Sequence, residues 1–155
     1  MSKARLNHVS VVARRLEESV AFYEKLFGAE ALPTPNFGFP VQWMRLGGGL
    51  QLHLFERGEK APSHHHFAIA VEDITPVYRA AREAGSLDSV TFGHHLYELP
   101  SGQLQLYMRD PAGNLVEVNA DDASRLGAEA AGELRRLSDG RPQDEVNRSA
   151  VLFLD

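Results

Sequence analysis

Two histidines and one glutamate have the residue types and the placement that a metal ion requires. His8 and His66 lie in the apolar, β-branched segments LNHVSVV and HFAIAV, and Glu117 lies in a similar segment, LVEVN. Segments of this composition are typical of strands. Two imidazoles and one carboxylate with open coordination positions suit Fe(II), and Mn²⁺ or Zn²⁺ can also occupy such a site. The three residues therefore predict one mononuclear metal site.

The expected strand faces agree with that prediction. Successive side chains of a strand point to opposite faces, so His66 shares its face with the small residues Ala68 and Ala70, which leave room for a bound group. Glu117 stands in an apolar setting, where a buried carboxylate is costly unless it is paired or bound to metal. The alternative is a structural role, because a single histidine in a strand is more often a packing residue than a ligand.

The elements that position these residues follow from apolar periodicity and from turn residues. Apolar side chains from Leu16 to Phe27 recur at helical spacing, and Gly28 stands where a helix commonly ends. The first half of the chain is predicted to contain a strand at Leu6–Val12, a helix at Leu16–Phe27, a proline-rich loop from Pro33 to Pro40, and strands at Val41–Leu46 and Leu50–Phe55 joined by Gly47–Gly49.

The same order recurs when His8 is superposed on His66. Thr75 is predicted to cap a second helix that has Pro76 at its first position and ends at Gly85. Further strands are expected at His66–Val71, Ser89–Phe92, Leu96–Leu99, Leu104–Met108 and Leu115–Asn119, with a turn at Pro100–Gly102. Two copies of one supersecondary unit explain this order better than one irregular domain does.

The residues after Asn119 have a different composition and form a predicted tail. Asp122–Ser138 carries an apolar stripe at helical spacing, residues 140–147 are polar, and Ser149–Leu154 is apolar enough for a strand. We assign residues 1–120 to one domain, with module one at about 4–57 and module two at about 64–120, and residues 121–155 to a C-terminal helix and tail. The tail is expected to pack on the core or across a dimer interface.

Composition narrows the classes of function. The chain has 155 residues, a net charge of −5 and no cysteine. Thiolate metal sites, disulfides and cysteine nucleophiles are therefore excluded, and the acidic balance argues against nucleic acid as a partner. No apolar run approaches the length of a membrane span, and the first residues have no apolar signal region. A cytoplasmic enzyme or binding protein is the expected class.

Four segments together resemble the vicinal-oxygen-chelate superfamily, also called the glyoxalase/bleomycin-resistance/extradiol-dioxygenase superfamily. They are LNHVSVV from Leu6, SVAFYEKLFG from Ser19, HFAIAVED from His66 and YMRDPAGNLVE from Tyr107, and they cover about residues 4–120. The resemblance implies an α+β fold, with two tandem βαβββ modules that form a curled mixed sheet around one metal cleft.

The resemblance also implies site residues and a metal. Carried over to this chain, the ligand positions are His8, His66 and Glu117, with Gln51 as a possible fourth where glyoxalase-type members commonly have a carboxylate. Tyr107 stands where extradiol enzymes have a similar tyrosine, although the histidine expected shortly before it is missing. His53 shares a face with Gln51 and is a candidate substitute ligand or proton-transfer group. The implied cofactor is one divalent metal ion per subunit, with Fe(II) favoured and Mn, Zn or Ni as alternatives.

The resulting functional hypothesis is a metal-dependent enzyme that binds two adjacent oxygens of a small-molecule substrate. Extradiol dioxygenase-like ring cleavage is the leading reaction. A glyoxalase-type lyase or isomerase acting on an α-keto substrate is one alternative, and a metal-free binding protein like the bleomycin-resistance members is another. His64 and His65 are assigned to the linker between modules, with a second metal site as a minor option. A homodimer is expected, because two such modules leave strand edges exposed.

Overall fold

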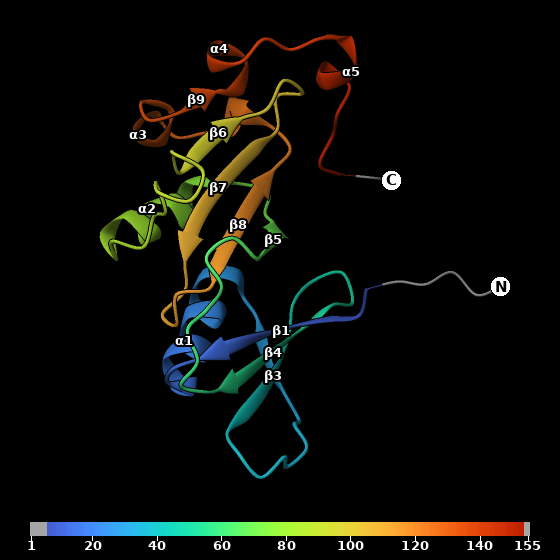
Figure 1. Cartoon of the computed structure of the whole chain (residues 1–155), viewed down its shortest axis with the longest axis vertical. Coiled ribbons are helices and arrows are strands. Elements are labelled where there is room, and N and C mark those ends of the chain that lie inside the picture. The colour runs from blue at the N-terminus through green and yellow to red at the C-terminus, as the bar shows by residue number, and fades with distance from the viewer. Residues whose placement is uncertain (1–5, 154–155) are drawn as a thin grey trace, which may run out of the picture. The chain divides into compact units, whose positions relative to one another are not determined.

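The structure is a computed structural model that describes residues 6–153. The chain divides into two compact units, and Figure 1 shows the elements of each. The first unit runs to Ser63 and includes Asp110–Asn114, while the second contains His64–Arg109 and the residues from Leu115 onward. Leu154, the last residue of the predicted C-terminal strand, lies outside the described residues.

The first unit is one helix packed on a four-stranded mixed sheet of order β1-β4-β3-β2. β1 is parallel to β4, and the other neighbours are antiparallel. Its elements are β1 (His8–Ala13), α1 (Leu16–Phe27), β2 (Glu30–Leu32), β3 (Val41–Arg45) and β4 (Gln51–Glu56). The helix has its predicted bounds, and Gly28 ends it with φ +61°, a left-handed conformation that glycine adopts without strain. β2 was not predicted.

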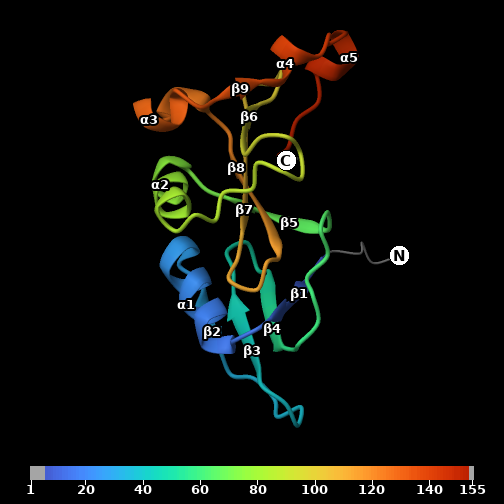
Figure 2. The same ribbon diagram turned by 60° about the vertical axis from the view of Figure 1, so that its left-hand side comes forward.

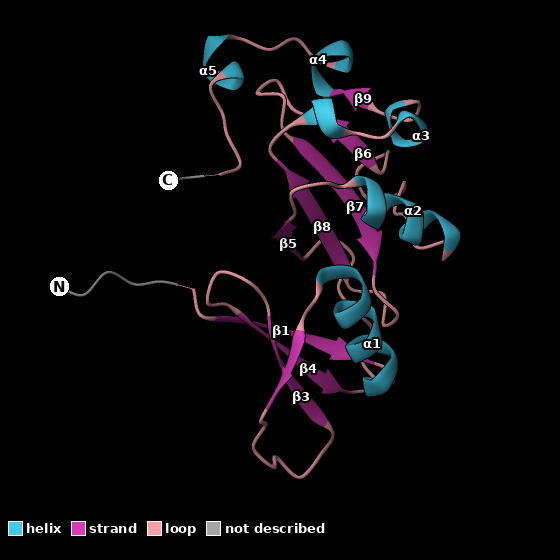
Figure 3. Ribbon diagram, turned by 180° about the vertical axis from the view of Figure 1, so that it is seen from behind, coloured by secondary structure: helices cyan, strands magenta, loops and turns pink. Residues whose placement is uncertain are grey.

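The second unit repeats that arrangement and extends it by one strand. Its sheet has the order β5-β8-β7-β6-β9, with β5 parallel to β8. The elements up to the tail are β5 (His66–Ala70), α2 (Thr75–Glu83), β6 (Leu96–Glu98), β7 (Leu104–Arg109) and β8 (Leu115–Ala120). Figure 3 colours these elements by type. The predicted pair of βαβββ modules is confirmed, and their strands form two mixed sheets.

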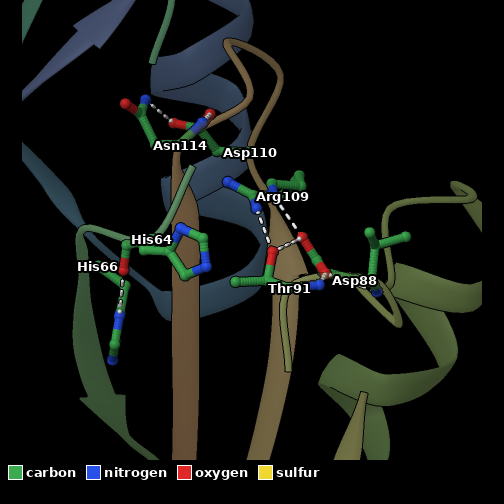
Figure 4. Close-up of polar contacts among 8 residues, drawn as sticks. His64, His66, Asp88, Thr91, Arg109, Asp110 and Asn114 are labelled. Carbon is green, nitrogen blue, oxygen red and sulfur yellow. Dashed lines mark hydrogen bonds and ion pairs between the residues drawn. The ribbon is translucent and has the colours of Figure 1, made fainter. Parts of the chain in front are cut away.

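Residues Ser89–Phe92, predicted as a strand, form a turn instead. Asp88 is the cause, because its carboxylate accepts hydrogen bonds from the backbone N–H groups of Val90 and Thr91 and from the Thr91 hydroxyl. Arg109 on β7 holds the same carboxylate at 2.5 Å and donates to Thr91 Oγ1 at 2.6 Å (Figure 4). An aspartate that satisfies its own backbone neighbours in this way favours a turn over an extended strand.

The tail is not the single helix predicted for Asp122–Ser138. It contains short elements, which are η1 (Ala123–Arg125), α3 (Ala128–Ala131), β9 (Arg135–Arg136), α4 (Leu137–Gly140) and α5 (Glu145–Arg148). Gly127 separates the first two because its backbone N–H donates to Thr75 Oγ1 at 2.9 Å. A Cβ at Gly127 would lie 2.7 Å from Thr75 Cγ2, so tertiary contact overrides the local helical pattern here.

The tail packs on the sheet of its own unit, as Figure 2 shows for β9 beside β6. Ala130 of α3 is fully buried, and Arg82 of α2 forms an ion pair with Glu129. β9 therefore covers the backbone edge of β6, which would otherwise be open to pairing.

Two smaller predictions about the chain differ from the structure. Thr75 is the first residue of α2 rather than its cap, and the N–H of Thr75 bonds to the Asp73 side chain at 2.8 Å. The described part of Ser149–Leu154 forms no strand, although the N–H of Leu152 donates to Gln103 Oε1 at 2.7 Å. None of the helices within residues 6–153 is long and apolar enough to span a bilayer.

Candidate functional site

His66 and Glu117 lie together in the second unit, as the sequence predicts. His66 opens β5, Glu117 lies on the neighbouring β8, and His66 Nε2 is 3.1 Å from Glu117 Oε2. The backbone oxygen of His64 accepts a hydrogen bond from His66 Nδ1 at 2.8 Å (Figure 4). Because a carbonyl can only accept, Nδ1 of His66 carries a proton, and Nε2 is the ring nitrogen that faces the carboxylate.

Glu117 is held by side-chain amides on its other oxygen. Gln105 Nε2 donates to Glu117 Oε1 at 2.8 Å, and Asn119 Nδ2 donates to the same atom at 2.7 Å. Glu117 is only 5% exposed. A buried carboxylate needs such donors, and they fix Oε2 in the direction of His66.

Tyr107 lies directly across from Glu117 in the β7–β8 register and is buried. Burial, the negative charge of Glu117 and a hydrogen bond to that carboxylate all raise the pKa of the Tyr107 phenol. The hydroxyl therefore keeps its proton at neutral pH. It can donate a hydrogen bond, but the raised pKa makes it a weak acid, and it cannot serve as a base there.

The first unit brings His8, Gln51 and His53 together. The rings of His8 and His53 stack with centroids 4.4 Å apart. The ring of Trp43 also stacks on that of His53, with centroids 4.5 Å apart. These residues line a pocket of about 450 Å³. Asn7 Oδ1 lies 2.6 Å from His8 Nδ1, so Nε2 of His8 is the atom available to a ligand.

His53 is buried and contacts Gln51, whose Oε1 lies 3.0 Å from His53 Nε2. Burial and the neighbouring His8 lower the pKa of His53, which favours the neutral imidazole that metals bind. Gln51 therefore orients His53 rather than standing apart as an independent donor.

Strand register changes the comparison between the two modules. In the first sheet His8 pairs with Gln51, and Ser10 pairs with His53. In the second sheet His66 pairs with Leu115, and Ala68 pairs with Glu117. His53 therefore occupies the position in its module that Glu117 occupies in the other. The sequence did not reveal this register, which makes His53 a better candidate than Gln51 for a fourth ligand.

The arrangement of His66 and Glu117 fits a divalent cation. Among residues 6–153, no group of three or more His, Asp or Glu side chains is close enough to hold a metal ion. However, an imidazole lone pair and a carboxylate oxygen that face each other at 3.1 Å repel unless a proton or a cation lies between them. His8 belongs to the other unit, so its place in a three-residue set stays a prediction.

His64, His94 and His95 have other contacts in the described part of the chain. His94 Nε2 lies 2.6 Å from the backbone oxygen of Glu133, and His95 Nε2 lies 2.9 Å from the Glu133 carboxylate. Both rings therefore face the tail. The predicted linker position of His64 agrees with its place just before β5, where it supports His66 through its backbone.

A second pocket, of about 700 Å³, lies within the second unit beside Gln105 and Tyr107. Its other walls come from the aromatic side chains of Phe92 and Tyr97 and from tail residues Leu134–Leu137 and Asp139–Arg141. Sequence reasoning missed the tail arginines of this pocket. The adjacent Arg135-Arg136 pair was the only signal, and it was hidden within an apparently helical stretch.

Two mixed sheets from repeated βαβββ modules define the fold class of this chain. A family model described as the Glyoxalase/Bleomycin resistance protein/Dioxygenase superfamily matches residues 5–118. The chain therefore belongs to this superfamily, which is the family that the sequence resembles.

Individual proteins are similar to this chain in sequence or in fold. The chain is 29% identical to Glyoxylase I 4 of Arabidopsis thaliana, over 73% of this chain and 68% of the relative. Its fold is similar to that of a lactoylglutathione lyase from Agrobacterium tumefaciens, with a TM-score of 0.55, 23% identity, and coverage of 77% of this chain and 96% of the other. It is also similar to the Oxidase ChaP-H2, with a TM-score of 0.62, 22% identity, and coverage of 77% and 94%.

Proposed function

We propose that this protein is a metal-dependent enzyme whose ion is held by His8, His66 and Glu117 and binds two adjacent oxygens of a substrate. The observation that carries the proposal is the 3.1 Å distance between His66 Nε2 and Glu117 Oε2. Each side chain is also held by a hydrogen bond at its other polar atom. Members of the superfamily often bind divalent metals. A bound metal would supply Lewis-acid polarisation of the substrate oxygens.

The residues of the chain have separate tasks in this proposal. Gln105 and Asn119 hold the Glu117 carboxylate, and the His64 carbonyl holds the tautomer of His66. Tyr107 keeps its proton beside Glu117 and can donate a hydrogen bond to an oxygen of the substrate. The aromatic stack of His8, His53 and Trp43 offers a flat surface for a ring.

That flat surface favours an aromatic diol as the substrate and ring cleavage with Fe(II) as the reaction. The test is anaerobic reconstitution of untagged protein with Fe(II), followed by a catechol and then oxygen. We expect the yellow ring-opened product from the wild type, a much lower rate from Tyr107→Phe, and none from His66→Ala. A Tyr107→Phe variant as active as the wild type would remove the proposed role of the phenol.

A second reaction is favoured by the register position of His53. A fourth ligand in addition to the triad is the arrangement expected of a glyoxalase-type lyase or isomerase. The names of Glyoxylase I 4 and of the Agrobacterium lactoylglutathione lyase point the same way. Turnover of methylglyoxal–thiol adducts with Ni²⁺ or Zn²⁺, without turnover of catechols, would assign this reaction. Ligand binding without any metal or turnover would instead assign a bleomycin-resistance-like binding protein.

We also propose that the chain forms a homodimer. β1 and β5 are each paired on one side only within the described sheets, so each offers a strand edge. The tail already packs on the sheet of its own unit through β9. Light scattering should therefore report a dimer for the full chain. A monomer at micromolar concentration would contradict the proposal, and truncation at Asp121 would show whether the tail contributes to association.

A further inference from the structure

The larger pocket of the second unit is bounded by residues that the family match does not include. The match ends at residue 118, whereas Leu134–Leu137 and Asp139–Arg141 form one side of the pocket. β9 pairs with β6 in parallel, with Arg135 level with Tyr97 and Arg136 level with Glu98. Backbone pairing therefore fixes the place of both arginines, as Figures 2 and 3 show for β9 beside β6.

The charges at this pocket are unbalanced in favour of cations. Arg135, Arg136 and Arg141 line it, and Asp139 is the acidic residue of the same lining. Arg136 is paired with Glu98 at 3.1 Å. Neither Arg135 nor Arg141 has an ion-pair partner among the described residues. Two unpaired guanidinium groups stand out in a chain with a net charge of −5.

Aromatic side chains line the same pocket. Phe92, Tyr97 and Tyr107 line it, and the Phe92 and Tyr107 rings lie 4.6 Å apart. Gln105, which also lines the pocket, donates to Glu117. A volume of about 700 Å³ is within the range of small-molecule sites. The pocket therefore combines guanidinium groups that suit a negative charge with aromatic rings that suit a flat apolar body.

We propose that this pocket binds an organic anion with a flat apolar body, whose carboxylate is held by Arg135 and Arg141. Arginine binds carboxylates through paired N–H donors, and an aromatic wall stacks on a planar ligand. The proposal goes beyond the proposed function, because it assigns a separate anion site that is lined by none of the proposed metal ligands.

Binding can be tested without turnover by comparing naphthoate with its uncharged amide, naphthamide, by calorimetry. Both have the same flat body, so the difference reports the carboxylate. We expect naphthoate to bind the full chain about tenfold more tightly than naphthamide, which corresponds to about 1.4 kcal/mol. The Arg135→Gln, Arg141→Gln double variant should lose that difference while it binds naphthamide as before.

Arg148→Gln and Arg125→Gln together form the matched control, because they remove the same charge from tail residues that do not line this pocket. This control should keep the preference for naphthoate. Equal affinity for the two compounds in the wild type, or an equal loss in the control, would overturn the proposal. So would the absence of naphthoate binding up to about 10 mM.

The measurement is made on chelator-treated protein and again with Mn²⁺ present, which separates this inference from the proposed function. Arginine-dependent binding without any metal binding would support the anion pocket and remove the metal-dependent enzyme. Metal binding without a preference for naphthoate would support the metal site and contradict the anion pocket.

Discussion

In the first sheet His53 lies level with Ser10, and in the second sheet Glu117 lies level with Ala68. Equivalent positions of two repeated modules thus carry an imidazole in one case and a carboxylate in the other. The imidazole is stacked between two rings, those of His8 and Trp43. The carboxylate is instead surrounded by amide donors and one histidine. One backbone repeat accepts either side chain when the neighbouring side chains match its charge.

The hairpin turns of the two sheets differ as well. The turn between β3 and β4 consists of exposed glycines, with positive φ at Gly48 and Gly49. The turn between β7 and β8 belongs to the first unit and is organised by the buried carboxylate of Asp110. Backbone freedom makes the first turn, whereas side-chain hydrogen bonds make the second. The two turns should therefore respond very differently to substitution.

The largest expected effect on stability is at Asp110. Its carboxylate accepts from the Tyr23 hydroxyl at 2.9 Å, from the Asn114 side chain at 2.7 Å, and from the backbone N–H groups of Ala112 and Asn114. Asp110→Ala leaves these buried donors without an acceptor and should lower the free energy of unfolding by about 3 kcal/mol. Urea denaturation followed by tryptophan fluorescence measures it.

The exposed turn provides the control for that experiment. Gly48→Ala places a side chain at φ +69°, with no atom near the new Cβ. Its cost is therefore only backbone strain of about 1 kcal/mol. If Gly48→Ala were as destabilising as Asp110→Ala, the contrast between the two turns would be wrong.

A smaller effect sharpens the contrast between His53 and Glu117. Since His53 holds the equivalent position and Gln51 only contacts its ring, His53→Ala should weaken metal binding about tenfold. Gln51→Ala should change the affinity by no more than about threefold. Competition with a metal-sensitive dye gives both dissociation constants. An order reversed between the two variants would restore Gln51 as the fourth ligand.

The smallest effect concerns His95, whose ring faces Glu133 of the tail. The tail covers the edge of the second sheet only. Burial lowers the pKa of His95 from 6.5, and the neighbouring His94 and Arg135 lower it further against the opposing effect of Glu133. At pH values between the lowered pKa and 6.5, His95 is therefore protonated more readily in the unfolded chain than in the folded protein. The contribution of neutral His95 to the stability of the fold is complete above pH 6.5, and it is lost as the pH falls towards the lowered pKa.

We expect the melting temperature of the wild type to fall more between pH 7 and pH 5 than that of His95→Gln. The difference should be smaller than the roughly 2–4 °C that 1 kcal/mol represents for a chain of this size. Thermal scans at both pH values measure it. A larger fall for the variant would show that His95 is not the group that gains the proton.

The sequence predicts the two repeated modules well, because the elements of each module depend on strong local patterns. The α1 bounds, for example, follow from an apolar stripe and a glycine that can adopt a positive φ. The pairing of His66 with Glu117 follows from residue types on predicted strands together with the family resemblance. These features need no information about distant contacts.

The features that the sequence failed to predict depend on such contacts. Residues Ser89–Phe92 form a turn around the Asp88 carboxylate, which is held by Arg109 from another element. Thr75 interrupts the tail at Gly127 from far along the chain. Strand register was also hidden, because alternation gives the face of His53 but not its partner Ser10.

The central claim is that one metal ion is bound by His66 and Glu117 together with His8. The most direct test is the metal affinity of untagged, chelator-treated protein, compared with that of Glu117→Gln and His8→Ala. Glu117→Gln keeps the size and the hydrogen-bonding shape of the side chain but removes the only anionic ligand. We predict about one ion per wild-type chain and a loss of affinity of about 100-fold or more in each variant. Equal affinity in the wild type and in Glu117→Gln would contradict the account.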